Sequence, residues 1–207
     1  MPATPIIHGP AFSTYVRSVM LCCRRKGVDF RLEAPGSKVA TLNPYRNVPV
    51  IEHAGLVLFE TAAICRYLDR AFEGPALSPA GPVQLAWMDQ WISVANCYFD
   101  PAIIRRYVLE YAFPKGEQGT VRLDRTAAAE PDIKRNLGIM DHALSQCEYF
   151  SGPAPGIADF IIVPMLDYLT NGLIPTNLLL EWPVIERYLD GMRQLPCSQG
   201  VLGNPRI

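Results

Sequence analysis

Residues 47–69, NVPVIEHAGLVLFETAAICRYLD, restrict the possible fold more than any other stretch of the chain. Two short apolar runs, 49–52 and 57–59, flank the turn sequence His53-Ala54-Gly55, and this pattern is typical of a β-hairpin. A helix is expected to follow, because five side chains recur at helical spacing: Thr61, Ile64, Cys65, Leu68 and Phe72. The stretch therefore predicts a β-β-α unit that begins at a Val-Pro bond.

A β-α-β pattern precedes this unit. Residues 4–8, TPIIH, are typical of a short strand, and Gly9-Pro10 ends it. From Ser13 onward apolar side chains recur at helical spacing, until Gly27 ends the helix. Residues 28–33, VDFRLE, are expected to form a second strand, parallel to the first. With a link over 34–47 that contains one short helical turn, the order βαβ, ββα is the thioredoxin-like arrangement.

We expect the remainder of the chain to be helical. Residues 73–82, EGPALSPAGP, contain three prolines and two glycines, a composition typical of an interdomain linker. Beyond them, helices are predicted over residues 83–111, 123–147 and 158–169, and a last one from Pro183. The first of these is apolar on nearly all sides, which predicts that it is buried.

These patterns predict two domains. The fold class is an α+β N-terminal domain of thioredoxin-like order followed by an all-α C-terminal domain. The boundaries are expected at residues 1–75 for the first domain, 76–82 for the linker and 83–207 for the helical domain. With 207 residues, 49% of them hydrophobic and 19% charged, the chain is long enough to bury a core and does not have a disordered composition.

The composition argues against several kinds of partner. The net charge of -1 gives no sign of nucleic-acid or membrane binding, and no segment is long and apolar enough to cross a bilayer. The six cysteines form no C-x-x-C pair and the three histidines are isolated, so we expect no metal. The start, MPATPIIHG, lacks the features of a secretory signal, and a reducing cytoplasm is the expected location.

Three motifs, in the same order, resemble those of cytosolic glutathione transferases, and the similarity covers nearly the whole chain. NPYRNVPVIEHAGLVLFETAAICRYLD is similar to the family's N-P-x-x-x-V-P-x-L and L-x-E-S-x-A-I-x-x-Y-L signatures. GIADF with VPML resembles its S/T-x-A-D segment, and WPVIERYLDGM resembles its last core helix. The N-terminal HGPAFSTYVRSVMLCCRRKGVDF is most similar to bacterial, phi-like and theta-like members, in which a serine activates glutathione. The resemblance implies a cytoplasmic, homodimeric detoxification enzyme that conjugates glutathione, its co-substrate, to hydrophobic electrophiles.

The resemblance places Ser13 at the catalytic position. Glutathione reacts as a thiolate, and a free thiol with a pKa of about 8.5 is mostly protonated at neutral pH. A hydroxyl donor and a helix N-terminus both stabilise the anion, and Ser13 lies where the first helix should begin. The residues alone favour a helix cap for Ser13, and Thr14 is the alternative contact for the sulfur. Arg17, one turn later, would either steady the thiolate or form a salt bridge at the surface or at an interface.

The same resemblance implies the other glutathione contacts. It implies a cis Val48-Pro49 bond, so that the Val48 backbone pairs with the cysteinyl unit like an added strand. Without it, a trans bond and an edge strand opened by Pro49 would be favoured. Glu60 suits the ammonium of the γ-glutamyl end, and Thr61 at a helix start suits its carboxylate, although Thr61 also suits a helix cap.

Three candidates were open for the glycyl carboxylate: Lys38, Arg46 and Asn47, of which Asn47 aligns best. We expect the electrophile between the domains, against aromatic side chains: Phe12, Tyr107, Tyr111 and Phe113. Helix packing is the alternative role for the two tyrosines.

Two further expectations concern assembly and folding. The predicted homodimer would bring Arg66 of one protomer to Asp89 of the other as a twofold-repeated ion pair. Asp159 resembles the acidic member of a capping box, but the capping position holds Gly156, which predicts a weakened helix start.

Other functions remain open on the same fold. A glutathione-dependent isomerase, dehalogenase or peroxidase would use the same thiolate. A ligand-binding or interaction relative would have lost parts of the glutathione site, whereas Ser13, Val48-Pro49 and Glu60-Thr61 are all present here.

Overall fold

The computed structural model describes residues 3–170 and 172–203, and the description below concerns this part of the chain. A four-stranded sheet is formed, in the order β2-β1-β3-β4, by four short strands: β1 (Ile6–His8), β2 (Arg31–Glu33), β3 (Val50–His53) and β4 (Leu56–Phe59). β1 and β2 are parallel, and the other two pairs are antiparallel. The predicted βαβ-ββα order is confirmed, and each strand of the hairpin lies within one residue of its expected position.

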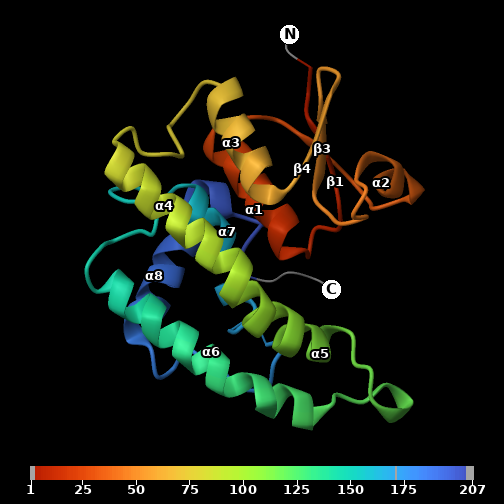
Figure 1. Ribbon diagram of the computed structural model, residues 1–207, viewed down its shortest axis with the longest axis vertical. Helices are drawn as coiled ribbons and strands as arrows, with labels where there is room; N and C mark the ends of the chain where they lie inside the picture. Colours follow the sequence, from red (N-terminus) through yellow and green to blue (C-terminus); the bar gives the residue numbers. More distant parts are fainter. Residues whose placement is uncertain (1–2, 171, 204–207) are drawn as a thin grey trace.

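Helices cover both faces of this sheet. α1 (Thr14–Arg25) and α3 (Thr61–Ala71) pack against each other on one side, and α2 (Ser37–Leu42) lies on the other (Figure 1). The apolar side chains of α1, apart from the partly buried Tyr15, are buried because this helix lies between the sheet and the helical half of the molecule. Its first turn consequently ends up at the junction between the two halves.

The helical half is built around one long, continuous helix. α4 (Pro82–Val94), the π-helical segment η1 (Ala95–Val108) and α5 (Leu109–Ala112) follow one another without a break, and Figure 1 shows them running along the length of this half. The other helices are α6 (Leu123–Leu144), α7 (Ile157–Asp167) and α8 (Pro183–Gln194), with short 3-10 turns at Glu117–Gly119 and Pro196–Ser198. Every residue of α7 is buried, so α7 forms the centre of the core.

The long helix is less buried than its composition predicts. Three large apolar side chains on it are exposed to solvent: Val83 by 76%, Trp87 by 40% and Tyr98 by 57%. The adjoining side contributes Met88, Trp91 and Phe99 to the core, and Trp91 contacts Trp87 at the edge between the two sides, with ring centroids 5.9 Å apart. When a helix is apolar on both sides, its sequence pattern does not show which side is buried, and here only one side is covered within this chain.

A buried ion pair holds α1 to α7. Arg17 is fully buried, and its guanidinium bonds to Asp167 and to the carbonyl of Val201, the latter at 2.8 Å. Arg193 on α8 bonds to the same carboxylate at 2.8 Å. Arg17 thus forms a salt bridge, the second of its two predicted roles, but the pair is buried between the two halves rather than at the surface. Its side chain lines neither of the cavities described below.

The start of α7 is stabilised in a way that the sequence motif did not show. Gly156 supplies no side chain, but the hydroxyl of Ser151 accepts from the Ala158 N–H at 3.0 Å. Asp159 accepts from the Gly156 N–H at 3.0 Å, so a serine from the preceding loop completes the box. A Cβ at Gly156 would lie 2.2 Å from the carbonyl oxygen of Leu77, which explains the glycine. The expectation of a weakened helix start is therefore wrong.

Three further findings apply to the described residues alone. The described residues include no helix that is long and apolar enough to cross a membrane, and no group of three or more side chains placed to hold a metal ion. All six cysteines lie within the described ranges, and each is a free thiol.

Candidate functional site

Two neighbouring cavities lie between the sheet domain and the long helix. The first, of about 210 Å³, has walls that are mostly apolar: Phe12, Ile104, Val108, Leu109, Phe113 and Tyr168. The second, of about 220 Å³, has polar walls: Asn43, Asn47, Glu60, Thr61, Asn96 and Arg105. We call them the apolar cavity and the polar cavity. They share Tyr15, Asn47, Val48 and Arg105, so they form one cleft with two kinds of surface.

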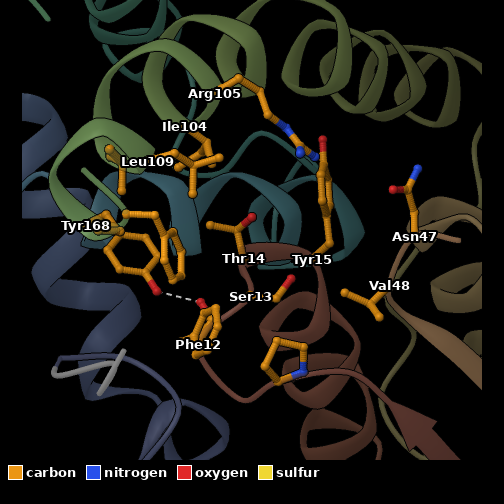
Figure 2. A pocket seen from close by; sticks show the side chains of 14 residues that line it. Phe12, Ser13, Thr14, Tyr15, Asn47, Val48, Ile104, Arg105, Leu109 and Tyr168 are labelled. Atoms are coloured by element: carbon orange, nitrogen blue, oxygen red, sulfur yellow. Dashed lines mark hydrogen bonds between the residues drawn. The ribbon is translucent and has the colours of Figure 1, made fainter. Parts of the chain in front are cut away.

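Ser13 lies at the start of α1 and lines the apolar cavity (Figure 2). Its backbone is extended, with φ -62° and ψ 129°, and its hydroxyl oxygen accepts from the Val16 N–H at 3.5 Å. A hydroxyl that accepts this bond keeps its own proton to donate. The capping role and a bond to a ligand sulfur are therefore compatible, and the first turn of α1 contains no acidic residue to oppose an anion.

The two residues after Ser13 also line the apolar cavity but are engaged differently. Tyr15 donates its phenol to the side-chain oxygen of Asn96 at 3.0 Å, and burial raises the pKa of this phenol. Its hydroxyl is thus held away from Ser13, as Figure 2 shows, where it reaches up toward Arg105. Thr14 lies on the same wall with no such bond, and remains the alternative contact for a sulfur.

The Val48-Pro49 bond is cis, as the resemblance implies. Val48 lines both cavities. The loop before it is braced by Asn43, whose amide donates to the carbonyl of Asn47 at 2.9 Å. Gly9 allows this loop to approach β1, because a Cβ there would lie 2.4 Å from Val16 and 3.1 Å from Val48. Sequence analysis did not assign a role to Asn43, although an Asn-Pro pair favours the start of a turn.

Glu60 and Thr61 lie together in the polar cavity, at the start of α3. Glu60 occupies the capping position with φ 71° and ψ 113°, a left-handed conformation that is costly for a side chain other than glycine. Among the described residues no side chain caps the first turn of α3, and Thr61 is its first residue rather than its cap. The N–H groups at this helix end are consequently available to a bound anion.

The candidates for the glycyl carboxylate lie in different places. Asn47 lines both cavities, whereas Lys38 on α2 lines neither and bonds to Glu52. Glu52 also contacts His8 at 2.7 Å, and these two bonds hold its pKa below its ordinary value. Arg46 is exposed and has a positive φ of 57°. The structure thus brings Asn47 to the cleft and engages Lys38 elsewhere.

The aromatic candidates separate into two groups. Phe12 and Phe113 line the apolar cavity with ring centroids 6.0 Å apart. Tyr107 and Tyr111 share a face, as their spacing predicts, with ring centroids 5.4 Å apart, but that face points toward α6 and a separate cavity. Tyr107 and Tyr111 therefore do not line the cavity beside Ser13, where the long helix instead contributes Ile104, Val108 and Leu109.

Tyr168 and Arg105 are two more lining residues that the sequence did not indicate. Tyr168, just beyond α7, donates its phenol to the carbonyl of Phe12 at 2.5 Å, and burial raises its pKa to about 12. Figure 2 shows this bond as a dashed line between two of the side chains that line the apolar cavity. Arg105 lines both cavities, and its Nε donates to Asp100 at 2.9 Å. A tyrosine at the end of an apolar helix and an arginine next to another arginine gave no distinguishing signal.

A thioredoxin-like sheet domain, an all-helical domain and a cleft between them define the class of this protein. The family models "Glutathione S-transferase, N-terminal domain" and "Glutathione S-transferase, C-terminal domain" match residues 12–71 and 96–196. Glutathione S-transferase F14 of Arabidopsis thaliana is 30% identical over 195 residues, which cover 87% of this chain and 76% of that protein. The chain belongs to the glutathione S-transferase family.

Two other similar proteins differ in how much of their length this chain matches. The structure of the theta class glutathione S-transferase from Xanthomonas axonopodis pv. citri, with glutathione bound, matches with a TM-score of 0.82 and 27% identity, covering 98% of both chains. Elongation factor 1-gamma of Prunus avium is 28% identical over 79% of this chain, but the match covers only 37% of that protein. The similarity to that protein is therefore limited to one part of a longer chain.

Proposed function

We propose that this chain is a glutathione S-transferase of the serine type, which ionises the glutathione thiol and conjugates it to hydrophobic electrophiles. The observation that carries the proposal is the position of Ser13, with its hydroxyl at the N-terminus of α1 and on the wall of the apolar cavity. The adjacent polar cavity offers one complementary group for each end of a peptide. The serine-type assignment follows from Ser13 rather than from the family match.

Glutathione fits the polar cavity by charge. The open N–H groups of α3, with Thr61, suit the γ-glutamyl carboxylate, and the exposed carboxylate of Glu60 suits its ammonium. Val48, just before the cis bond, offers its backbone to the cysteinyl unit. Asn47 offers an amide to the glycyl carboxylate, and we assign this role to it in preference to Lys38, which Glu52 occupies. The sulfur then lies toward Ser13.

The reaction proceeds in two steps. The thiol proton leaves to solvent, and the thiolate is held by the Ser13 hydroxyl and the positive end of α1. The sulfur then forms a bond to an electrophilic carbon in the apolar cavity, while the bond from that carbon to its leaving group breaks and the leaving group takes the electron pair. The protein contributes thiolate stabilisation and proximity.

We also propose a cytoplasmic homodimer. Six free thiols suit a reducing compartment. The exposed apolar side of the long helix, formed by Val83, Trp87 and Tyr98, suits a surface that a second protomer covers. Arg66 and Asp89 do not support the expected twofold-repeated pair, because they bond to each other within one chain.

The test is glutathione-dependent turnover of a neutral aryl halide, combined with retention of the protein on immobilised glutathione. We expect both. A control variant, Ser93→Ala, removes an exposed hydroxyl on α4 that bonds only within its own helix and should change neither result. Retention without turnover of aryl halides, enones or peroxides would favour a ligand-binding relative, and the absence of both would contradict the proposal.

A further inference from the structure

Arg105 is the one cationic side chain among the described residues that line either cavity, and it lines both. The apolar cavity otherwise has no charged wall residue in the described part of the chain, and the polar cavity adds only Glu60. Arg105 therefore lies at the boundary between the polar cavity and the apolar cavity. A single cation at this position restricts the kind of molecule that the apolar cavity can bind.

The local helix geometry fixes this cation. Asp100 and Arg105 are five residues apart in the π-helical segment η1, whose i to i+5 period brings their side chains together. Asp100 is only 6% exposed, and its carboxylate binds Arg105 through Nε. This bond raises the pKa of Arg105 and keeps its stem in one place. The neighbouring Arg106 instead binds Asp132 on α6 at 2.6 Å, on the other side of the helix.

The two terminal nitrogens of Arg105 are left for a ligand. Its Nε is engaged by Asp100, and no acceptor in the described part of the chain bonds to Nη1 or Nη2. The side chain is 57% exposed, and Figure 2 shows its guanidinium above the cavity, next to the phenol of Tyr15. Tyr15 donates to Asn96, which holds its ring as a wall beside the guanidinium.

We propose that Arg105 selects electrophiles that carry a carboxylate, which it binds through Nη1 and Nη2 while the reactive carbon lies in the apolar cavity near Ser13. This inference rests on the proposed function. A carboxylate that enters an apolar cavity needs a partner, and a guanidinium fork matches it with two parallel bonds. The γ-glutamyl carboxylate of glutathione has its own site at α3, so it does not need Arg105.

The experiment compares two electrophiles that differ only in charge: 4-chloro-3,5-dinitrobenzoate and its methyl ester. In both, the glutathione sulfur displaces chloride from the same ring carbon. The variants are Arg105→Gln, Arg105→Lys, and Arg106→Gln as a matched control that removes the neighbouring cation without touching the cleft. For each protein, kcat/KM is measured for both electrophiles, together with KM for glutathione.

We expect Arg105→Gln to lower kcat/KM for the benzoate roughly tenfold, the lower end of the range for a charged hydrogen bond, because the side chain is partly solvated. The ester should fall much less, and KM for glutathione should stay close to that of the wild type. Arg105→Lys should recover only part of the loss, because it restores the charge but not the fork. Arg106→Gln should behave as the wild type on both electrophiles.

Three outcomes would overturn the inference. Equal losses on benzoate and ester would make Arg105 a structural residue, and a rise in KM for glutathione alone would assign it to the γ-glutamyl carboxylate. An equal loss of kcat/KM for the benzoate in Arg106→Gln would mean that the loss comes from long-range electrostatics and not from a contact with Arg105. Failure of the wild type to turn over either electrophile would contradict the proposed function itself, and is thereby distinguishable from these three.

Discussion

The helices α1 and α3 both begin at the cleft, but their first turns are completed in opposite ways. At α1 the backbone of Ser13 is relaxed and its hydroxyl caps the helix. At α3 the backbone of Glu60 has a positive φ, and no side chain in the described part of the chain caps the first turn. α1 is thus complete without a ligand, whereas α3 is strained and leaves its N–H groups open.

This difference indicates a division of labour. A capped helix end still presents its dipole and the hydroxyl proton, which is what a sulfur anion requires. An uncapped end presents N–H donors, which is what a carboxylate requires. We therefore propose that the start of α3 binds glutathione and that the start of α1 supports the reaction. The start of α7, capped by Ser151 and Asp159 inside the core, shows what a purely structural helix start looks like.

The largest effect should come from Ser13→Ala. Removing the hydroxyl takes away the donor to the thiolate, and we expect kcat to fall roughly a hundredfold, as for the loss of one donor to a reacting anion. Thr14→Val, which removes the neighbouring hydroxyl, should change kcat only slightly. Steady-state kinetics with a neutral aryl halide would check both, and the reverse pattern would move the role to Thr14.

Ser151→Ala should sharpen the contrast with a structural cap. It leaves the buried Ala158 N–H without its acceptor, so we expect the free energy of unfolding to fall by about 2 kcal/mol. Activity per folded molecule should not change. Chemical denaturation and active-site titration would measure the two quantities, and an unchanged stability would mean that Asp159 alone completes this helix start.

Glu60→Gln should weaken glutathione binding about tenfold, because the charged bond to the ammonium is replaced by a neutral one. The thiolate fraction of the glutathione that does bind should stay the same. Calorimetry measures the affinity. A lower thiolate fraction at saturation would contradict the separation of binding at α3 from chemistry at α1.

The smallest expected effect is a gain in stability, in the variant Glu60→Gly. Glu60→Gly relieves the positive φ, so the free energy of unfolding should rise by up to about 1 kcal/mol, while glutathione binding falls. Thermal unfolding with and without glutathione would show the two changes together. A variant that is less stable than the wild type would show that the Glu60 side chain stabilises the fold and that α3 is not strained for its ligand.

Much of this arrangement could be predicted from local sequence. The hairpin, α1 and α3 were predictable because their apolar periodicity and turn residues are local signals. The cis bond at Val48-Pro49 was predictable only by resemblance, since an isolated Val-Pro pair favours trans. The faces of the long helix were not predictable, because both sides are apolar and spacing does not say which one meets the cleft. That is why Tyr107 and Tyr111 were expected at the cleft, although they line a separate cavity, and why Ile104 was not identified as a lining residue.

Contacts between distant segments were the other gap. In the sequence Arg105 looks like an ordinary surface charge, and only the folded structure shows that it lines both cavities. Ser151 lies outside the motif that it completes, because the chain loops back to the start of α7. Both depend on packing rather than on spacing.

The most direct test is a pH titration of the glutathione thiol in the complex, in which the ultraviolet absorbance of the thiolate is measured at each pH. We expect the bound thiol to titrate well below the pKa of about 8.5 of a free thiol, and to return toward that value in Ser13→Ala. Bound glutathione that titrates like the free peptide in the wild-type protein would contradict the account.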